Sequence, residues 1–157
     1  MYKRKTWCEK LADSKDLPKV CQIEPAKRAR FGGARTMVIP APREVDALMK
    51  KVRPGKLITI NELRAALARK HKAGTACPFM TGIGAWIAAH AAEESAATGR
   101  KRITPYWRTL KSGGELNPKF PRAIGRLKRM LQAEGHRVVV KGRGAFVAEY
   151  QKVLAAL

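Results

Sequence analysis

The middle of the chain constrains the fold more than any other part. Residues 59–71 are expected to form a helix, because Thr59 and Glu62 have the spacing of a capping box at its start. A short loop with a glycine and a proline follows, and a second helix is expected over residues 79–98, ended by Gly99. Two helices joined by so short a connection predict a helix-turn-helix.

The second helix of this pair has two apolar faces of different size. The bulky face consists of Ile83, Trp86, Ile87, His90 and Ala91. The small face consists of Gly82, Ala85, Ala89, Ala92 and Ala96. Small side chains allow a helix to lie close to another backbone, and the sequence leaves open whether that is a neighbouring helix or a nucleic acid.

Shorter elements flank the central pair. Further helices are expected at residues 6–12, 43–52, from the prolines at 118 and 121 to residue 134, and at 148–157. Two strands, 138–140 and 145–147, are expected to form a hairpin with a basic glycine turn, which would act as a wing. The expected fold is mainly α with a small β-hairpin, a single winged helix-turn-helix-like domain. A basic amino-terminal arm with a short helix is expected over residues 1–35, and the domain over residues 36–157.

The charge of the chain selects the class of partner. It has 33 Lys and Arg residues against 12 Asp and Glu residues, a net charge of +21, and 45% of its residues are hydrophobic. Residues 100–143 hold thirteen basic and two acidic residues, more than half of the surplus. Such a chain can bury a core and suits a polyanion, with nucleic acid as the first candidate and an anionic membrane as the second.

Other function classes have weaker support. No run reaches the roughly 18 apolar residues of a membrane span, and the first residues lack a signal-peptide pattern, so we expect a cytoplasmic, nucleoid-associated protein without a membrane partner. The residues that could bind a soft metal are widely separated: Cys8, Cys21, Cys77, His71, His90 and His136. We therefore expect no metal site, no cofactor and unpaired cysteines.

Three short motifs occur along the chain, and their order is informative. The first is Val52-Arg53-Pro54-Gly55-Lys56-Leu57-Ile58-Thr59, the second is Pro105-Tyr106-Trp107-Arg108, and the third is Gly113-Gly114 followed by Lys128-Arg129-Met130-Leu131-Gln132-Ala133-Glu134-Gly135-His136. In this order they resemble the DNA-binding domain of the O6-alkylguanine-DNA alkyltransferases over about residues 39–136. The family has Pro-x-Gly-x-Val-x-Thr/Ser at the first position, its Pro-Cys-His-Arg active site at the second, and Lys-x-x-Leu-Leu-x-x-Glu-Gly-His at the third.

The resemblance fails at the reacting residues. Tyr106 and Trp107 stand where the family has its acceptor cysteine and the histidine that activates it. A phenol with a pKa of about 10 is mostly protonated at neutral pH and lacks the soft sulfur of a thiolate. The pattern is therefore similar to the non-catalytic alkyltransferase-like proteins, which bind O6-alkylguanine in duplex DNA, flip it out and pass the lesion to excision repair.

The resemblance also implies a lesion pocket at the former active site. Its residues would be Pro105, Tyr106, Trp107, Arg108, Ser112 and Glu134. The two aromatic residues would either form a floor on which an extruded base stacks or plug the old pocket, and the sequence favours neither. No catalytic residue is expected.

A DNA-binding surface is implied by the same comparison, with the second central helix in the minor groove and cations on phosphates. Its residues are Thr59, Ile60, Thr81, Gly82, Ile83, Gly84, Ala85, Arg108, Lys111, Arg122, Arg126, Lys141 and Arg143. Thr81 occupies the place of the arginine finger that fills the gap left by a flipped base, and it is too short to do so. Phe79 or Met80 would then be the wedge.

The expected function is that of a non-catalytic, monomeric protein that binds double-stranded DNA and senses alkylated guanine, with excision-repair proteins as further partners. The alternative is an architectural or RNA-binding protein that reuses the scaffold without recognising lesions. A third reading, an enzyme with altered chemistry, depends only on Tyr106 and Glu134.

Overall fold

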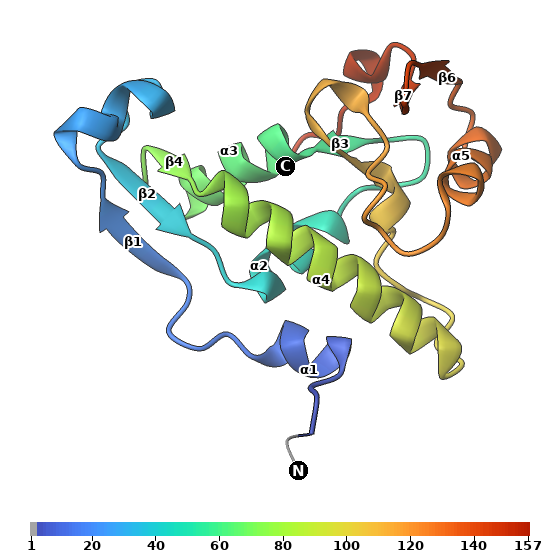
Figure 1. Cartoon of the computed structure of the whole chain (residues 1–157), viewed down its shortest axis with the longest axis horizontal. Helices are drawn as coiled ribbons and strands as arrows, with labels where there is room; N and C mark the ends of the chain where they lie inside the picture. The colour runs from blue at the N-terminus through green and yellow to red at the C-terminus, as the bar shows by residue number, and fades with distance from the viewer. Residues whose placement is uncertain (1–2) are drawn as a thin grey trace.

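The computed structural model describes residues 3–157, and its longest helix, α4 (Pro78–Ala97), runs through the middle of the molecule (Figure 1). The other helices are α1 (Trp7–Ala12), α2 (Pro42–Met49), α3 (Ile60–Lys70) and α5 (Ile124–Ala133), with 3-10 helices η1 (Pro25–Phe31), η2 (Tyr106–Arg108), η3 (Ser112–Gly114) and η4 (Tyr150–Val153). The strands are β1 (Lys19–Gln22), β2 (Thr36–Ile39), β3 (Ile58–Thr59), β4 (Thr75–Ala76), β5 (Thr109–Leu110), β6 (Val138–Lys141) and β7 (Gly144–Val147). The fold is thus mixed helical with small sheets.

The two central helices agree closely with the prediction. The Thr59 hydroxyl accepts a hydrogen bond from the backbone N–H of Asn61 at 3.2 Å, and the Thr59 N–H donates to the Glu62 carboxylate at 2.8 Å, which makes the capping box of α3. Helix α4 begins with Pro78, at a position where the missing N–H would have no partner within the helix. Its end is followed by Gly99, whose φ of +95° lies in the region that glycine favours.

Helix α4 packs closely against α2. Ala85 and Ala88 are almost fully buried there. Gly84 lies so close to α2 that a Cβ atom on it would come 2.8 Å from Val45 Cγ2 and 3.5 Å from Pro42 Cα. Ala85, Ala89 and Ala92 of the predicted small face are buried, so they serve packing within the protein, whereas Gly82 of the same face has open space at its Cβ position.

The bulky face of α4 is partly covered by α1. The Trp7 ring stacks on His90 with centroids 4.3 Å apart and meets Trp86 edge-on at 4.7 Å. The backbone N–H groups of Trp7 and Cys8 donate to the Glu94 carboxylate at 3.0 and 3.1 Å, so a side chain of α4 satisfies the free donors of α1. The amino-terminal helix is thereby fixed to the body of the protein.

The strands of residues 3–157 form three small sheets. In the first, β1 pairs antiparallel with β2, and β2 pairs parallel with β4, so the pairing crosses the boundary predicted between an arm (1–35) and a domain (36–157). In the second, β3 pairs parallel with β5. The third is the predicted hairpin of β6 and β7, with Lys141 opposite Gly144. Only the hairpin follows from the sequence, because it alone joins neighbouring segments.

The prediction of a helix at residues 148–157 is wrong. Glu149 has a φ of +54°, which interrupts any helix there, and only η4 follows. The last residues are extended instead: the Leu57 N–H donates to the Val153 carbonyl at 2.9 Å, and the Ala155 N–H donates to the Leu57 carbonyl at 2.8 Å. The chain end therefore serves as a strand partner near the core.

Two helices are shorter than predicted. Helix α5 begins at Ile124 rather than near the prolines at 118 and 121, because Arg122 has a left-handed φ of +83°. Helix α2 covers Pro42–Met49 rather than residues 43–52.

The contact between α2 and α4 generates a matched pair of substitutions. Gly84→Ala should lower the free energy of unfolding by about 1–2 kcal/mol, because the new methyl group overlaps Val45. Gly82→Ala should raise it by about 0.5–1 kcal/mol, because nothing lies within 4 Å of its Cβ position and alanine favours a helix. Urea unfolding measures both, and equal effects of the two substitutions would contradict this packing.

Candidate nucleic-acid interface

A groove runs between the amino-terminal half of α4 and the loop that follows β5. Its volume is about 670 Å³. It is lined by Pro78, Phe79, Gly82, Ile83 and Trp86 from α4 and by Lys111, Asn117, Pro118 and Lys119 from the loop. It therefore combines apolar walls with a basic rim.

Two aromatic side chains of the groove are accessible to solvent. Phe79 is 72% exposed and Trp86 is 36% exposed, and both stand among the few large hydrophobic residues at the surface of the described chain. Lys111 and Lys119 are exposed beside them. Aromatic faces stack on nucleobases and lysines bind phosphates, so this combination suits a nucleic acid.

The loop that forms the second wall is fixed in place at several points. Gly114 has a φ of +83°, and a Cβ atom on it would overlap the ring of Tyr150, so only glycine fits there. Leu116 and Phe120 are buried, and the Leu116 N–H donates to the carbonyl of Ala145 in β7 at 2.8 Å. The hairpin and the core therefore hold the loop against α4.

Tyr106 fills the predicted lesion pocket. Its side chain is 0% exposed, and its hydroxyl donates to the Glu93 carboxylate at 2.6 Å, which also pairs with Arg122 at 2.7 Å. Its ring meets Trp107 and Phe120 edge-on at 5.5 and 5.9 Å. Burial, together with the neighbouring carboxylate, raises the pKa of the Tyr106 phenol far above its ordinary value. Of the two roles left open for this residue, the plug is the one that the structure has.

Arg108 is a buried structural residue, contrary to the prediction that it contacts phosphate. Its Nε and Nη2 atoms donate to the Glu134 carboxylate at 3.0 and 2.6 Å, and Nη1 donates to the Val52 carbonyl at 2.7 Å. The Trp107 indole N–H donates to the same carboxylate at 3.1 Å. Three of the six predicted pocket residues, Trp107, Arg108 and Glu134, thus form a closed network around a buried guanidinium, and Tyr106 contacts it through the Trp107 ring.

The network changes the titration of its acidic member. Burial works to raise the pKa of the Glu134 carboxyl, but hydrogen bonds from Arg108 and Trp107 outweigh burial and hold that pKa below its usual range. Burial lowers the pKa of His136 nearby, whose buried Nε2 atom has no hydrogen-bond partner among the described residues. The lowered pKa of Glu134 favours the folded state above the ordinary pKa of that carboxyl, whereas the lowered pKa of His136 means that protonation of this ring on acidification disfavours folding.

The other predicted pocket residues lie on either side of this network. Pro105 is buried directly before Tyr106. Ser112 is exposed, and its hydroxyl lies 3.3 Å from the Asn61 amide oxygen at the start of α3. Ser112 therefore lies beside the start of α3 and outside the closed network.

Most of the predicted DNA-facing residues of α3 and α4 are turned inward. Thr81 is 0% exposed, and its hydroxyl donates to the Cys77 carbonyl at 2.7 Å. Thr59 is buried as the cap of α3, Ile60 packs partly against the core, and Gly84 and Ala85 face α2. Gly82 and Ile83 alone among the predicted residues of α4 line the groove.

The remaining predicted cations lie at the surface. Lys111 is on the rim of the groove, with its ammonium group 3.4 Å from the Glu115 carboxylate. Arg126 is exposed on α5, and Lys141 and Arg143 are exposed at the turn of the hairpin. Arg126, Lys141 and Arg143 are therefore exposed without a carboxylate partner among residues 3–157, whereas Lys111 pairs with Glu115 and Arg122 pairs with Glu93.

Several residues of the groove are missing from the predicted site. The loop residues Asn117, Pro118 and Lys119 carry no motif of their own, and they meet α4 only in the folded protein. From the sequence, Phe79 is expected only as a candidate wedge, and Trp86 only as part of the bulky face of the helix, although both are large aromatic residues on a helix rich in alanine and glycine.

Residues 3–157 show no alternative site of metal or membrane type. No group of three or more His, Cys, Asp or Glu side chains in this range could hold a metal ion. The three cysteines are unpaired. None of the helices described is both long and apolar enough to cross a bilayer.

Comparison with known proteins gives partial likenesses to solved structures only. No protein-family model and no curated protein sequence matches the chain. Schizosaccharomyces pombe Atl1, solved with damaged DNA containing O6-carboxymethylguanine, superposes with a TM-score of 0.48 at 16% identity, over 74% of this chain and 94% of that one. S. pombe ATL in complex with DNA gives a TM-score of 0.47 at 17% identity, with the same coverage. Neither likeness establishes a shared activity.

The buried pair of Arg108 and Glu134 predicts the pH dependence of stability. Glu134→Gln should lower the free energy of unfolding at pH 7 by about 3 kcal/mol, because it leaves a buried guanidinium without its counter-charge. The pKa of Glu134 is lower in the folded protein than its ordinary 4.5, so its contribution is complete above that pH and is lost as pH falls through the lowered value. The difference in the free energy of unfolding between wild type and Glu134→Gln should therefore become smaller as the pH is lowered.

Urea titrations at several pH values measure this gap. The exposed Glu149→Gln is the matched control and should change stability little at any pH. A Glu134→Gln effect as small as that of the control would contradict a structural role for the network.

Proposed function

We propose that the chain is a non-catalytic protein of alkyltransferase-like type that binds duplex DNA at the groove. In this proposal α3 and α4 act as a helix-turn-helix, the β6–β7 hairpin acts as a wing, and the amino-terminal end of α4 enters the minor groove. The protein groove beside α4 accepts an alkylated guanine that has rotated out of the duplex. The protein acts as a cytoplasmic, nucleoid-associated monomer and passes the lesion to excision-repair proteins.

The observation that carries this proposal is the exposed aromatic groove with its lysine rim on a chain of net charge +21. Exposed aromatic rings beside cations are what a stacked base and its phosphate require. Phe79 is exposed in the first turn of α4, where it can enter the base stack and fill the gap that an extruded base leaves. Gly82, with open space at its Cβ position, allows close approach of a DNA strand.

The absence of catalysis is supported by the environment of Tyr106. The phenol is buried and donates a hydrogen bond to the Glu93 carboxylate, and its raised pKa keeps it protonated at neutral pH. A protonated, inaccessible hydroxyl is not a nucleophile for an alkyl group. Glu134 is bound to Arg108 and Trp107, which leaves it no role as a base.

A second candidate is an architectural DNA-binding or RNA-binding protein that does not recognise lesions. The observation that favours it is the burial of both Thr81, at the place of the family's finger, and Tyr106, at the place of its acceptor. The two candidates differ in whether alkylation of a base changes affinity.

Salt dependence tests DNA binding itself. If the lysines at the rim and the exposed cations of α5 and the hairpin engage about six phosphates, a plot of log affinity against log salt should have a slope of about −5. Lys111→Ala with Lys119→Ala should make the slope shallower by about 2, since two phosphate contacts are lost.

The control for this test is Arg100→Ala with Lys101→Ala, which removes the same charge beyond the other end of α4. That helix has 20 residues and is about 30 Å long, so these side chains are far from the groove. The control should leave the slope nearly unchanged. Equal effects of the two double variants, or no duplex binding by wild type, would refute contact at the groove.

Duplexes with and without a single O6-methylguanine test lesion recognition. Wild type should prefer the alkylated duplex, and Phe79→Ala should remove most of that preference, because base stacking on an aromatic side chain contributes about 1–3 kcal/mol. Phe79→Ala should lower the affinity for the intact duplex by a smaller factor. An affinity ratio near one for wild type would favour the architectural candidate instead.

Tyr106→Cys tests the absence of catalysis. The new thiol should not accept a methyl group, because Trp107 beside it cannot accept a proton and the negative charge of Glu93, which binds the Tyr106 hydroxyl, would disfavour a thiolate. Incubation with DNA that carries a labelled methyl group measures transfer. Label on wild type or on the variant would contradict the proposal.

A further inference from the structure

The connection between β1 and β2 forms a compact projection, residues 24–35, which we term the basic tip. It contains η1 and is held by internal hydrogen bonds: the Gly33 N–H donates to the Arg28 carbonyl at 2.9 Å, and the Ala34 N–H donates to the Phe31 carbonyl at 3.1 Å. Figure 1 shows it at the opposite end of the molecule from α5 and the hairpin. The tip is therefore an ordered extension of the fold.

The charges of the basic tip are poorly balanced. It has four cations, Lys27, Arg28, Arg30 and Arg35, and one acid, Glu24. Lys27 pairs with Glu24 at 3.2 Å, and Arg28 donates to a backbone carbonyl. Arg30 and Arg35 are exposed, and no carboxylate among residues 3–157 lies within ion-pair distance of either. Two free guanidinium groups on an ordered projection suit a polyanion.

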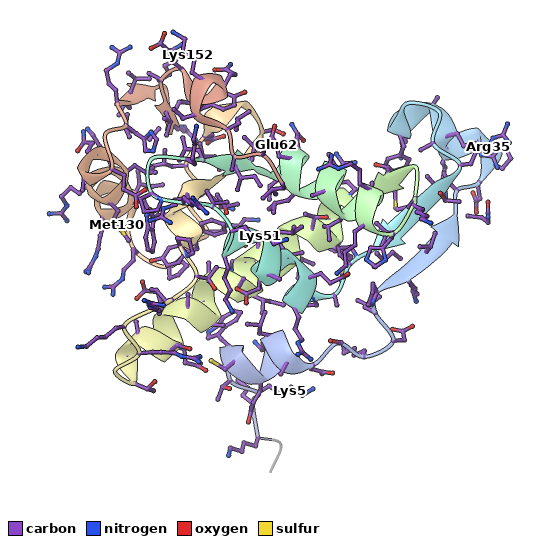
Figure 2. All side chains as sticks on the ribbon, turned by 180° about the vertical axis from the view of Figure 1, so that it is seen from behind. Lys5, Arg35, Lys51, Glu62, Met130 and Lys152 are labelled. Carbon is purple, nitrogen blue, oxygen red and sulfur yellow. The ribbon has the colours of Figure 1, made fainter. Side chains whose placement is uncertain are left out.

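The base of the tip is fixed beside the turn that leads into α4. Strand β2 pairs with β4, with Met37 opposite Thr75, and β4 is followed directly by α4. The Gly74 N–H donates to the Thr36 hydroxyl at 3.0 Å, and a Cβ atom on Gly74 would lie 2.9 Å from the Cβ of Ala34. The tip thus stands on the side of the molecule where the amino-terminal end of α4 begins, as Figure 2 shows for Arg35, with Met130 of α5 on the other side.

From this placement we propose that the basic tip is a second DNA-contacting surface, which binds phosphates of the duplex outside the stretch held at the groove. The inference rests on the proposed function. A duplex is a stiff rod with one negative charge per about 1.7 Å of its axis, so DNA held at the end of α4 continues past the groove. Arg30 and Arg35 are positioned to pair with its phosphates, and their contacts carry no sequence information.

The test compares duplexes of about one helical turn and about three turns, 10 and 30 bp. Arg30→Ala with Arg35→Ala should make the salt slope on the longer duplex shallower by about 2 and leave the shorter duplex unchanged. In hydroxyl-radical footprinting of the longer duplex, the double variant should protect a shorter stretch than wild type, with the loss at one end. Arg100→Ala with Lys101→Ala removes equal charge at the far end of α4 and should change neither. Thermal unfolding of both variants should match wild type, because all four side chains are exposed.

The outcomes separate this inference from the proposed function. If Arg30→Ala with Arg35→Ala has the same salt slope and the same footprint as wild type, the inference is wrong but the proposed function still stands. Equal weakening on both duplex lengths would also overturn it, because it would show a general effect of charge. If wild type binds neither duplex, the proposed function fails and the inference fails with it.

Discussion

The buried guanidinium of Arg108 joins three parts of the chain that are far apart in sequence. It donates hydrogen bonds to the carbonyl of Val52 after α2 and to the carboxylate of Glu134 at the end of α5. The neighbouring Trp107 donates its indole N–H to the same carboxylate. A charge of this kind is tolerated in the interior only when each donor has a partner, so the three segments must come together. Tyr106, two residues before Arg108, is buried against Glu93, so the whole segment of η2 is part of the core. Any ligand must therefore bind outside it, and the groove beside α4 is where accessible aromatic and basic groups meet.

Local signals predicted the local elements of this fold. The capping box of Thr59 and Glu62 places the start of α3, and Gly99 marks the end of α4. The hairpin follows from two β-branched runs around a glycine turn. In each case the hydrogen bonds join residues a few positions apart, so the sequence pattern contains the whole interaction.

The errors concern features that depend on distant partners. Helix α4 is apolar on all sides, so its sequence does not tell which face is buried; the close fit of Gly84 to Val45 decides it. From sequence alone, a basic residue is expected at the surface, and so Arg108 is predicted to bind phosphate. Its burial depends on Glu134, a partner 26 residues away. The extended chain end needs Leu57 as its strand partner, nearly a hundred residues earlier. The groove has the same origin, because its loop residues acquire a role only beside Phe79 and Trp86.

The central claim is that DNA is held at the groove while the segment around Tyr106 stays closed. Photocrosslinking of a duplex that carries a photoreactive guanine analogue, followed by mass spectrometry of the crosslinked peptides, tests this most directly. The account predicts crosslinks within residues 78–86 and 111–119 and none at Tyr106. Crosslinks concentrated at Tyr106 or Trp107 would show an open pocket in the place of the plug and would contradict the account.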